Sequence, residues 1–143
     1  MKSMNIYLNF KDNTEEAFNF YKTVFGKEFS MLQRFKDIPE SEDVQENDKD
    51  KIMHVSLPIC DGYVLMGTDA PESMGFKINV GNNFYINLNV DSEEEADTLY
   101  KALSADGKVQ MDLQNTFWGA YYGSLTDKFG IQWMINFEKK PMK

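Results

Sequence analysis

Ile6-Tyr7-Leu8-Asn9-Phe10 returns eighty residues later as Ile86-Asn87-Leu88-Asn89-Val90. In both copies apolar and polar residues alternate with a period of two, which is typical of a strand with one buried face. Both copies are followed by a helix-start pattern, Asn13-x-x-Glu16 in the first half and Ser92-x-x-Glu95 in the second, in which a short polar side chain caps free amides. The shared order of strand and cap predicts an internal duplication.

Each cap is followed by apolar residues with the spacing of a helix that buries one face. They are Ala17, Phe20, Tyr21 and Val24 in the first half, and Ala96, Leu99, Tyr100 and Leu103 in the second. Three strand-like runs follow each helix, at about 28–36, 51–60 and 63–68, and at 108–115, 118–126 and 131–137. Each half therefore reads βαβββ, and the predicted fold class is α+β.

The repeats span about residues 4–68 and 83–138, and we expect one domain of residues 1–143 in which a linker joins them. A chain of 143 residues is long enough for one domain with a sizeable core. Segment 37–50 is rich in Asp and Glu and poor in apolar residues, so we expect a solvated loop there.

The composition excludes several classes of protein. Fifteen Lys and Arg against 23 Asp and Glu give a net charge of −8, so neither nucleic acid nor an anionic membrane is an expected partner. The single cysteine, Cys60, rules out an intrachain disulfide and cysteine-rich zinc sites. No apolar stretch approaches the roughly 20 residues of a membrane-spanning helix, and no signal-peptide core is visible. We therefore expect a cytoplasmic protein.

Alternation also predicts which side chains face away from the helices. In the first strand of each repeat they are Asn5, Tyr7 and Asn9, and Tyr85, Asn87 and Asn89. Later strands add His54, Ser56 and Cys60 in the first repeat, and Gln132, Met134 and Asn136 in the second. This face is neutral and rich in amides, whereas a flat exposed sheet more usually carries charges. It therefore predicts a concave lining that binds a ligand through hydrogen bonds.

Candidate chemical groups are few. His54 is the only histidine, and it is a candidate general base or ligand-binding group, although a lone histidine is often structural. Cys60 lies about 20 Å away along an extended strand, too far for a Cys–His dyad. Neither a serine-hydrolase motif nor a phosphate loop is present. The rings of Trp118 and Tyr122 offer stacking area for a ligand or a dimer seam. No residue is assigned a catalytic role.

Three stretches carry a resemblance to a known family. They are Tyr7-Leu8-Asn9-Phe10 with Glu16-Ala17-Phe18-x-Phe20-Tyr21-x-x-Val24-Phe25-Gly26; Met53-His54-Val55; and Trp118-Gly119 with Tyr122-Gly123-x-x-x-Asp127-x-Phe129-Gly130-x-x-Trp133. From about Asn5 to Phe137 the chain resembles the PhnB-like proteins of the vicinal oxygen chelate superfamily, which includes glyoxalase I, bleomycin-resistance proteins and extradiol dioxygenases. The resemblance implies two βαβββ modules that form a curled mixed sheet with a central cleft, and a homodimer.

Metalloenzymes of that superfamily hold a divalent ion through His or Glu side chains. The resemblance places the matching positions near Asn5 or Tyr7, near Leu65 or Met66, at about Tyr85 and at about Met134. None of these residues is His, Asp or Glu, and amide, phenol and thioether groups are poor ligands for Zn, Ni or Fe. We therefore expect neither a bound metal nor a cofactor.

The leading hypothesis is a metal-independent protein that binds a small molecule. Its expected ligand site comprises Asn5, Tyr7, Asn9, His54, Tyr85, Asn87, Trp118, Tyr122 and Gln132. The alternative is a lyase, isomerase or dioxygenase of the same superfamily that recruits a metal through His54 with partners such as Glu28 or Asp69. In a third interpretation the protein's own side chains fill the cleft, and the chain is an assembly module. Whether the protein is an enzyme stays open.

Overall fold

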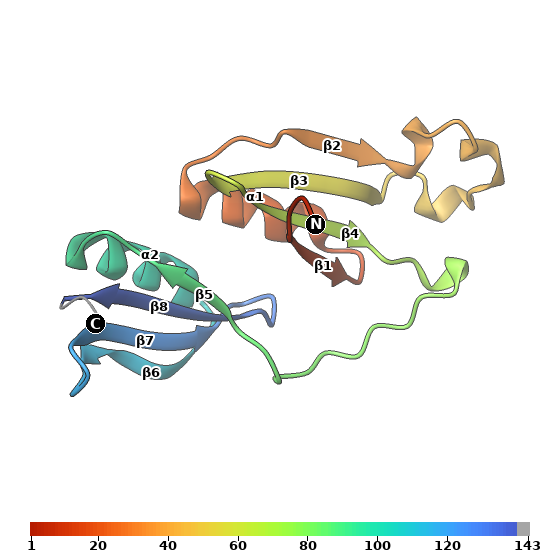
Figure 1. Ribbon diagram of the computed structural model, residues 1–143. Coiled ribbons are helices and arrows are strands. Elements are labelled where there is room, and N and C mark those ends of the chain that lie inside the picture. The colour runs from red at the N-terminus through yellow and green to blue at the C-terminus, as the bar shows by residue number, and fades with distance from the viewer. Residues whose placement is uncertain (140–143) are drawn as a thin grey trace. The chain divides into compact units, whose positions relative to one another are not determined.

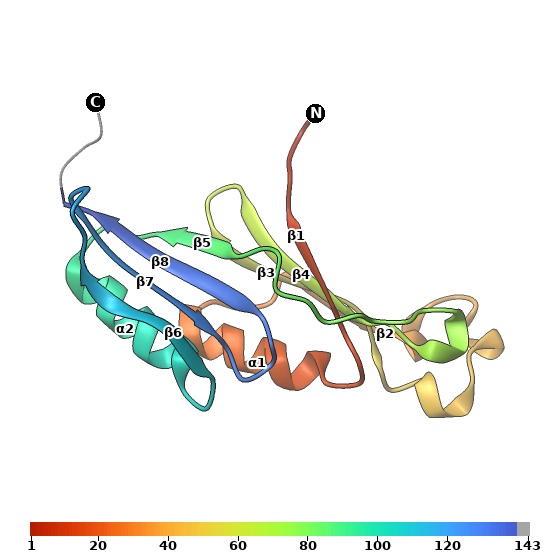
Figure 2. The same ribbon diagram turned by 90° about the horizontal axis from the view of Figure 1, so that it is seen from below.

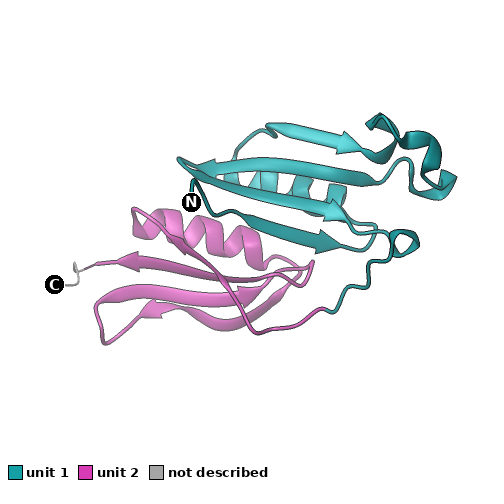
Figure 3. Cartoon of the chain, turned by 45° about the vertical axis from the view of Figure 1, so that its right-hand side comes forward, with its two compact units in different colours: residues 1–79 teal, residues 80–143 magenta. Residues whose placement is uncertain are grey.

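The computed structural model describes residues 1–139, which divide into two compact units, residues 1–79 and residues 80–139 (Figure 3). Each unit contains one four-stranded mixed sheet with a helix packed against it (Figure 1). The order of elements, β-α-β-β-β, is the same in both units. The predicted α+β class and the internal duplication are therefore confirmed.

In the first unit, strand β1 (Ile6–Phe10) leads into helix α1 (Thr14–Phe25). The next strands are β2 (Met31–Arg34), β3 (Ile52–Cys60) and β4 (Tyr63–Asp69). The strands lie in the order β1-β4-β3-β2. β1 pairs with β4 in parallel, and the other two pairs are antiparallel.

The second unit repeats this arrangement. Strand β5 (Ile86–Asn89) leads into helix α2 (Glu93–Ser104), followed by β6 (Lys108–Asn115), β7 (Ala120–Thr126) and β8 (Gln132–Glu138). The order is β5-β8-β7-β6, and β5 pairs with β8 in parallel. Across residues 1–139, neither helix reaches the length and apolarity that crossing a membrane requires.

The core of each unit lies between the helix and the sheet face that it covers (Figure 2). The predicted alternation is visible in β1, where Leu8 and Phe10 are buried and Tyr7 is 49% exposed. In β8, Trp133 and Ile135 are fully buried. Removal of these apolar faces from water is the main force that holds each helix on its sheet.

The buried stripe of α1 differs from the prediction by a partial rotation. Ala17 and Tyr21 are fully buried as expected, but so is Phe18, whereas Phe20 is only half-buried. Gly67 of β4 explains the difference, because a Cβ at that position would lie 2.5 Å from Cε1 of Phe18. The missing side chain leaves room for the Phe18 ring against the sheet.

The cap predicted at the start of α1 is wrong. Asn13 is the N-cap residue, but its side chain makes no capping hydrogen bond to α1, all of whose residues are described. Instead, the buried carboxylate of Asp69, at the end of β4, accepts a hydrogen bond from the Thr14 amide at 2.9 Å. The cap predicted for α2 is confirmed, because Ser92 Oγ accepts from the Glu95 amide at 3.0 Å.

The acidic segment 37–50 is more ordered than a solvated loop. It holds or adjoins three short 3-10 turns at Phe35–Asp37, Ser41–Asp43 and Glu46–Asp48. Lys51 Nζ pairs with the buried carboxylate of Asp48 at 2.7 Å and with Asp12 at 2.8 Å, and the Ser73 hydroxyl donates to Asp48. These contacts fasten the segment to the β1–α1 connection and to the chain after β4.

Two strands are shorter than predicted. β2 covers only Met31–Arg34 of the predicted run 28–36. β7 begins at Ala120 rather than at residue 118 because residues 116–119 form the turn between β6 and β7. Gly119 supplies the positive φ of 91° in that turn, a backbone conformation that glycine adopts readily.

Candidate functional site

Each sheet has a second face, turned away from the helix of its own unit, which we call the open face of that unit. In the first unit it carries Tyr7 and Asn9 of β1, which are exposed, together with His54 and Ser56 of β3. Asn5 lies just before β1, and its amide nitrogen donates to Ser3 Oγ at 3.5 Å.

Three residues of this open face form a hydrogen-bonded chain. Tyr7 Oη lies 3.2 Å from His54 Nδ1, and His54 Nε2 lies 2.7 Å from Ser56 Oγ. The Tyr7 and His54 rings are tilted at a centroid distance of 5.6 Å. Partial burial raises the pKa of Tyr7, against the opposing effect of a hydrogen bond with Thr68. The phenol therefore stays protonated near neutral pH and serves as a hydrogen-bonding group.

The link to Ser56 was not predicted from the sequence. The sequence feature that could have predicted this contact is the i, i+2 spacing, which places His54 and Ser56 on one face of the same strand. A neutral imidazole between two hydroxyls donates through one nitrogen and accepts through the other. The chain Tyr7–His54–Ser56 can therefore bind a hydrogen-bonding ligand or relay a proton.

The open face of the second unit carries a network of neutral groups. Tyr85 Oη donates to Gln110 Oε1 at 2.5 Å, and Gln110 Nε2 donates to Gln132 Oε1 at 3.2 Å and to Thr126 Oγ1 at 2.8 Å. Gln132 Nε2 donates to the carbonyl of Phe84 at 2.6 Å. Gln132 is only 6% exposed. Its amide group connects Gln110, and through Gln110 the Tyr85 hydroxyl, to the backbone of Phe84.

Gln110 is a member that sequence reasoning missed. It lies at an irregularity in β6, where the pairing with β7 shifts between Val109 and Met111. Such a bulge re-aims a side chain and breaks the simple alternation on which the face assignment depends.

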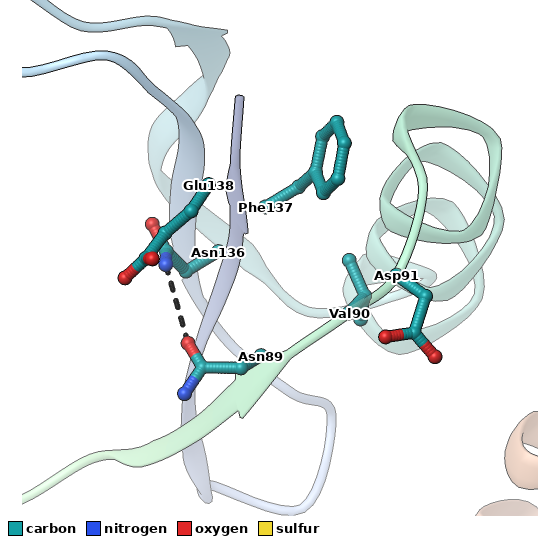
Figure 4. Close-up of a pocket in the computed structure, with 6 residues that line it drawn as sticks. All are labelled: Asn89, Val90, Asp91, Asn136, Phe137 and Glu138. Carbon is teal, nitrogen blue, oxygen red and sulfur yellow. Dashed lines mark hydrogen bonds between the residues drawn. The ribbon is translucent and has the colours of Figure 1, made fainter. Parts of the chain in front are cut away.

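A depression of about 310 Å³ opens at the carboxyl ends of β5 and β8 (Figure 4). It is lined by Asn89, Val90, Asp91, Asn136, Phe137 and Glu138. Asn89 Oδ1 accepts hydrogen bonds from Asn136 at 3.2 Å and from Asn87 at 3.3 Å. Of the predicted site residues, Asn87 therefore contacts the lining of the depression. The volume of the depression lies at the lower end of the range for ligand sites.

Aromatic rings cluster beside the turn between β6 and β7. Trp118 is 49% exposed and contacts the ring of Tyr122 at 6.1 Å, so these two predicted residues lie together. Phe117 is 97% exposed and meets Trp118 edge-on at 5.0 Å. The cluster offers apolar stacking area at the end of the second open face.

The strand register shows that the two open faces also share a row of similar side chains. In each unit, four side chains stand in one row across the open face, with a serine in the third strand between two methionines. The rows are Tyr7-Met66-Ser56-Met31 in the first unit and Asn87-Met134-Ser124-Met111 in the second.

The residues of the two open faces do not fit a divalent metal. Across residues 1–139, no three His, Cys, Asp or Glu side chains come together where they could hold an ion. Of the partners considered for His54, Asp69 binds backbone amides in the core and Glu28 pairs with Lys22 at 3.0 Å. The side chains that these faces do offer, such as the Tyr7 phenol, the Asn87 amide and the Met134 thioether, are poor ligands for Zn, Ni or Fe.

Comparisons with known proteins agree with this architecture. The family model described as 3-demethylubiquinone-9 3-methyltransferase matches residues 2–136. Protein YjdN of Escherichia coli (strain K12) is 30% identical over 142 residues, an alignment that covers 94% of each chain. The crystal structure of protein PA1353 from Pseudomonas aeruginosa is 37% identical, with a TM-score of 0.84 over 96% of this chain and 98% of that one.

Two further solved structures extend the comparison. A putative 3-demethylubiquinone-9 3-methyltransferase, PhnB protein, from Bacillus cereus is 25% identical, with a TM-score of 0.73 over 94% of this chain and 98% of that one. A glyoxalase/bleomycin resistance protein/dioxygenase family enzyme from Burkholderia phytofirmans PsJN is 21% identical, with a TM-score of 0.63 over 94% and 96%. The latter likeness concerns the fold alone, and it confirms the predicted fold of two βαβββ modules.

Proposed function

Because the chain belongs to the PhnB-like family of the glyoxalase/bleomycin resistance/dioxygenase superfamily, we propose that it binds a small uncharged molecule without the help of a metal ion. The proposed ligand surface is the open face of each unit. Its members are the residues expected from the sequence: Asn5, Tyr7, Asn9 and His54 in the first unit, and Tyr85, Asn87, Trp118, Tyr122 and Gln132 in the second. Recognition or sequestration, rather than a chemical step, is the proposed activity.

The observation that carries this proposal is a set of neutral, hydrogen-bonded side chains on each open face. Tyr7, His54 and Ser56 form a chain in one unit, and Tyr85, Gln110 and Gln132 form a network in the other. Groups held in place by such contacts lose little conformational freedom when a ligand binds, which favours affinity. Neutral side chains of this kind pair best with a neutral ligand, because an unpaired charge is costly to desolvate.

Metal independence is supported by donor chemistry. The positions that correspond to metal ligands in the superfamily carry phenol, amide or thioether groups, which bind Zn, Ni and Fe poorly. Chemistry that depends on a Lewis acid has no suitable ligand set among the described residues. The homodimer implied by the family resemblance stays a prediction.

Elemental analysis tests the metal part of the proposal. We expect protein purified without chelators to contain Ni, Zn, Fe and Mn well below one ion per chain, because the chain offers no set of strong ligands. A stoichiometric ion that survives dialysis would contradict the proposal and favour the lyase, isomerase or dioxygenase alternative.

A ligand-observed NMR screen of neutral aromatic and glycosylated compounds tests binding itself. For compounds that bind, we expect Tyr7→Phe or Tyr85→Phe to weaken affinity by about three- to tenfold, the effect of one lost hydrogen bond. Thr98→Ala, on the exposed surface of α2, is the matched control and should leave affinity within about twofold. A screen without any binder would contradict the proposal and favour an assembly module.

A further inference from the structure

The two serine–methionine rows differ in one respect. In the first unit, Ser56 Oγ lies 2.7 Å from the imidazole of His54. In the second unit, Ser124 stands at the same register position and is only 6% exposed as a residue, yet its hydroxyl makes no hydrogen bond to any of residues 1–139. The hydroxyl is not among the fully buried polar atoms of the described chain, so a molecule on the open face can reach it and form the hydrogen bond that the protein does not supply.

The reason for the difference lies two residues earlier on each strand. His54 precedes Ser56, whereas Tyr122 precedes Ser124 at the equivalent position of β7. The Tyr122 ring contacts Trp118 at a centroid distance of 6.1 Å and does not hydrogen-bond to Ser124 within the described chain. Thus one row contains its own imidazole, and the other leaves the serine without a partner.

From this pairing we propose that the open face of the second unit contains a ligand subsite centred on Ser124, and that it takes a planar nitrogen heteroaromatic ring. The ring would bind the Ser124 hydroxyl as the His54 imidazole binds Ser56. This inference rests on the proposed function and specifies one ligand class for it.

The neighbours of Ser124 suit such a ring. Met134 and Met111 pair with it from either side, and a thioether sulfur makes favourable contacts with aromatic rings. Asn87 pairs with Met134 in the place that Tyr7 has in the first unit, where the Tyr7 phenol contacts the other nitrogen of His54. The Asn87 amide therefore offers a second hydrogen bond to the ring.

Room for a larger ligand lies next to this row. Asn136 lines the depression of about 310 Å³, pairs with Tyr122 across the sheet and follows Met134 by two residues along β8. Substituents on a ring at Ser124 can therefore extend along β8 toward the depression.

Benzimidazole is a suitable probe because it is planar and carries one donor and one acceptor nitrogen. The full chain labelled with ¹³C at the methionine ε-methyl groups should give nine resonances, of which Met111 and Met134 are assigned by Met→Leu substitution. We expect titration with benzimidazole to shift these two resonances and to leave Met53 and Met74 unmoved. Shifts confined to other methionines, or no shift at all, would overturn the inference.

Variants separate the serine hydroxyl from general surface effects. Ser124→Ala should weaken benzimidazole binding by about three- to tenfold, the effect of one hydrogen bond. Ser104→Ala, the same change on α2, should leave the affinity within about twofold. Equal affinity in both variants would contradict a role for Ser124.

A converse variant gives an independent check. Tyr122→His places an imidazole where the first unit has His54. We expect this imidazole to hydrogen-bond to the Ser124 hydroxyl, and therefore to weaken benzimidazole binding at least tenfold. Its thermal unfolding midpoint shows whether the variant is folded; if it is not, the Ser124→Ala result decides. If the neutral compounds of the screen bind and benzimidazole does not, the subsite is wrong while the proposed function stands; if nothing binds, both fail.

Discussion

Asp69, which is distant in sequence from the start of α1, makes the helix-capping contact that the sequence pattern assigned to the neighbouring Asn13. Its buried carboxylate accepts hydrogen bonds from the amides of Thr14 at 2.9 Å and Ile52 at 2.8 Å, and so joins the start of α1 to the start of β3. A carboxylate is a stronger acceptor than the amide oxygen of Asn13, because hydrogen bonds to ionised groups are roughly twice as strong as neutral ones.

Substitution of Asp69 tests this at the residue scale. We expect Asp69→Asn to lower the free energy of unfolding by about 1–3 kcal/mol, because one amide loses a charged acceptor in the core. Asn13→Ala should change it by less than about 0.5 kcal/mol, since no cap bond is lost. Urea unfolding of both variants measures the difference. A larger loss of stability in Asn13→Ala than in Asp69→Asn would show that Asn13, and not Asp69, caps the start of α1.

At the scale of elements, Tyr100 fixes helix α2 on its sheet. Its hydroxyl donates to the carbonyls of Met111 at 2.9 Å and Ser124 at 3.2 Å, and so bridges β6 and β7. Gly123 lies directly beneath its ring, because a Cβ there would be 2.8 Å from Tyr100 Cε2 and 3.0 Å from the Leu113 amide nitrogen. The close approach of helix and hairpin therefore requires a residue without a side chain.

The corresponding prediction concerns Gly123→Ala. We expect the extra methyl group to destabilise the protein by about 1–3 kcal/mol, because neither the Tyr100 ring nor the backbone of Leu113 can move freely. Gly81→Ala is the control, since only Asn83 Oδ1, at 3.9 Å, lies near a Cβ at that position. Thermal unfolding measures both variants. Equal midpoints would show that β6 and β7 can move to accommodate the methyl group without a loss of stability.

At the scale of the whole molecule, with its net charge of −8, ion pairing becomes important where distant segments meet. Within the first unit, Lys51 lies between Asp12 and Asp48, and Ser73 donates to Asp48. Lys51 and then Ser73, through their hydrogen bonds, hold the pKa of Asp48 below its ordinary value of 3.8. Three segments that are far apart in the chain, at Asp12, at 48–51 and at Ser73, are thus joined at one carboxylate and one ammonium group.

The sign of the pH dependence follows from that lowered pKa. A carboxylate whose pKa is lower in the folded state stabilises the fold above its unfolded-state pKa and loses this contribution as the pH falls through the folded-state pKa. We therefore expect the stability difference between the wild type and Asp48→Asn to be full at pH 7 and to shrink below about pH 4. Urea unfolding across this range measures the difference, and a constant difference would contradict the assignment.

Much of the architecture was predictable because it depends on local periodicity. The alternation in Ile6–Phe10 and in 86–90, followed by helical spacing, is a property of neighbouring residues, and it determined the duplication and the helix-covered faces. It also placed Tyr7 and His54 on one face of the first unit, where they are in contact.

Only the tertiary structure decided which residues of those faces meet. Tyr7 and His54 are 47 positions apart, and their contact depends on the strand order β1-β4-β3-β2, which no local pattern encodes. The bulge that brings Gln110 into the network, the carboxylate of Asp69 at the helix start and the unpaired hydroxyl of Ser124 depend likewise on register between strands. Register is set by packing over the whole sheet, so the sequence by itself determined the faces, and the fold determined the contacts made on them.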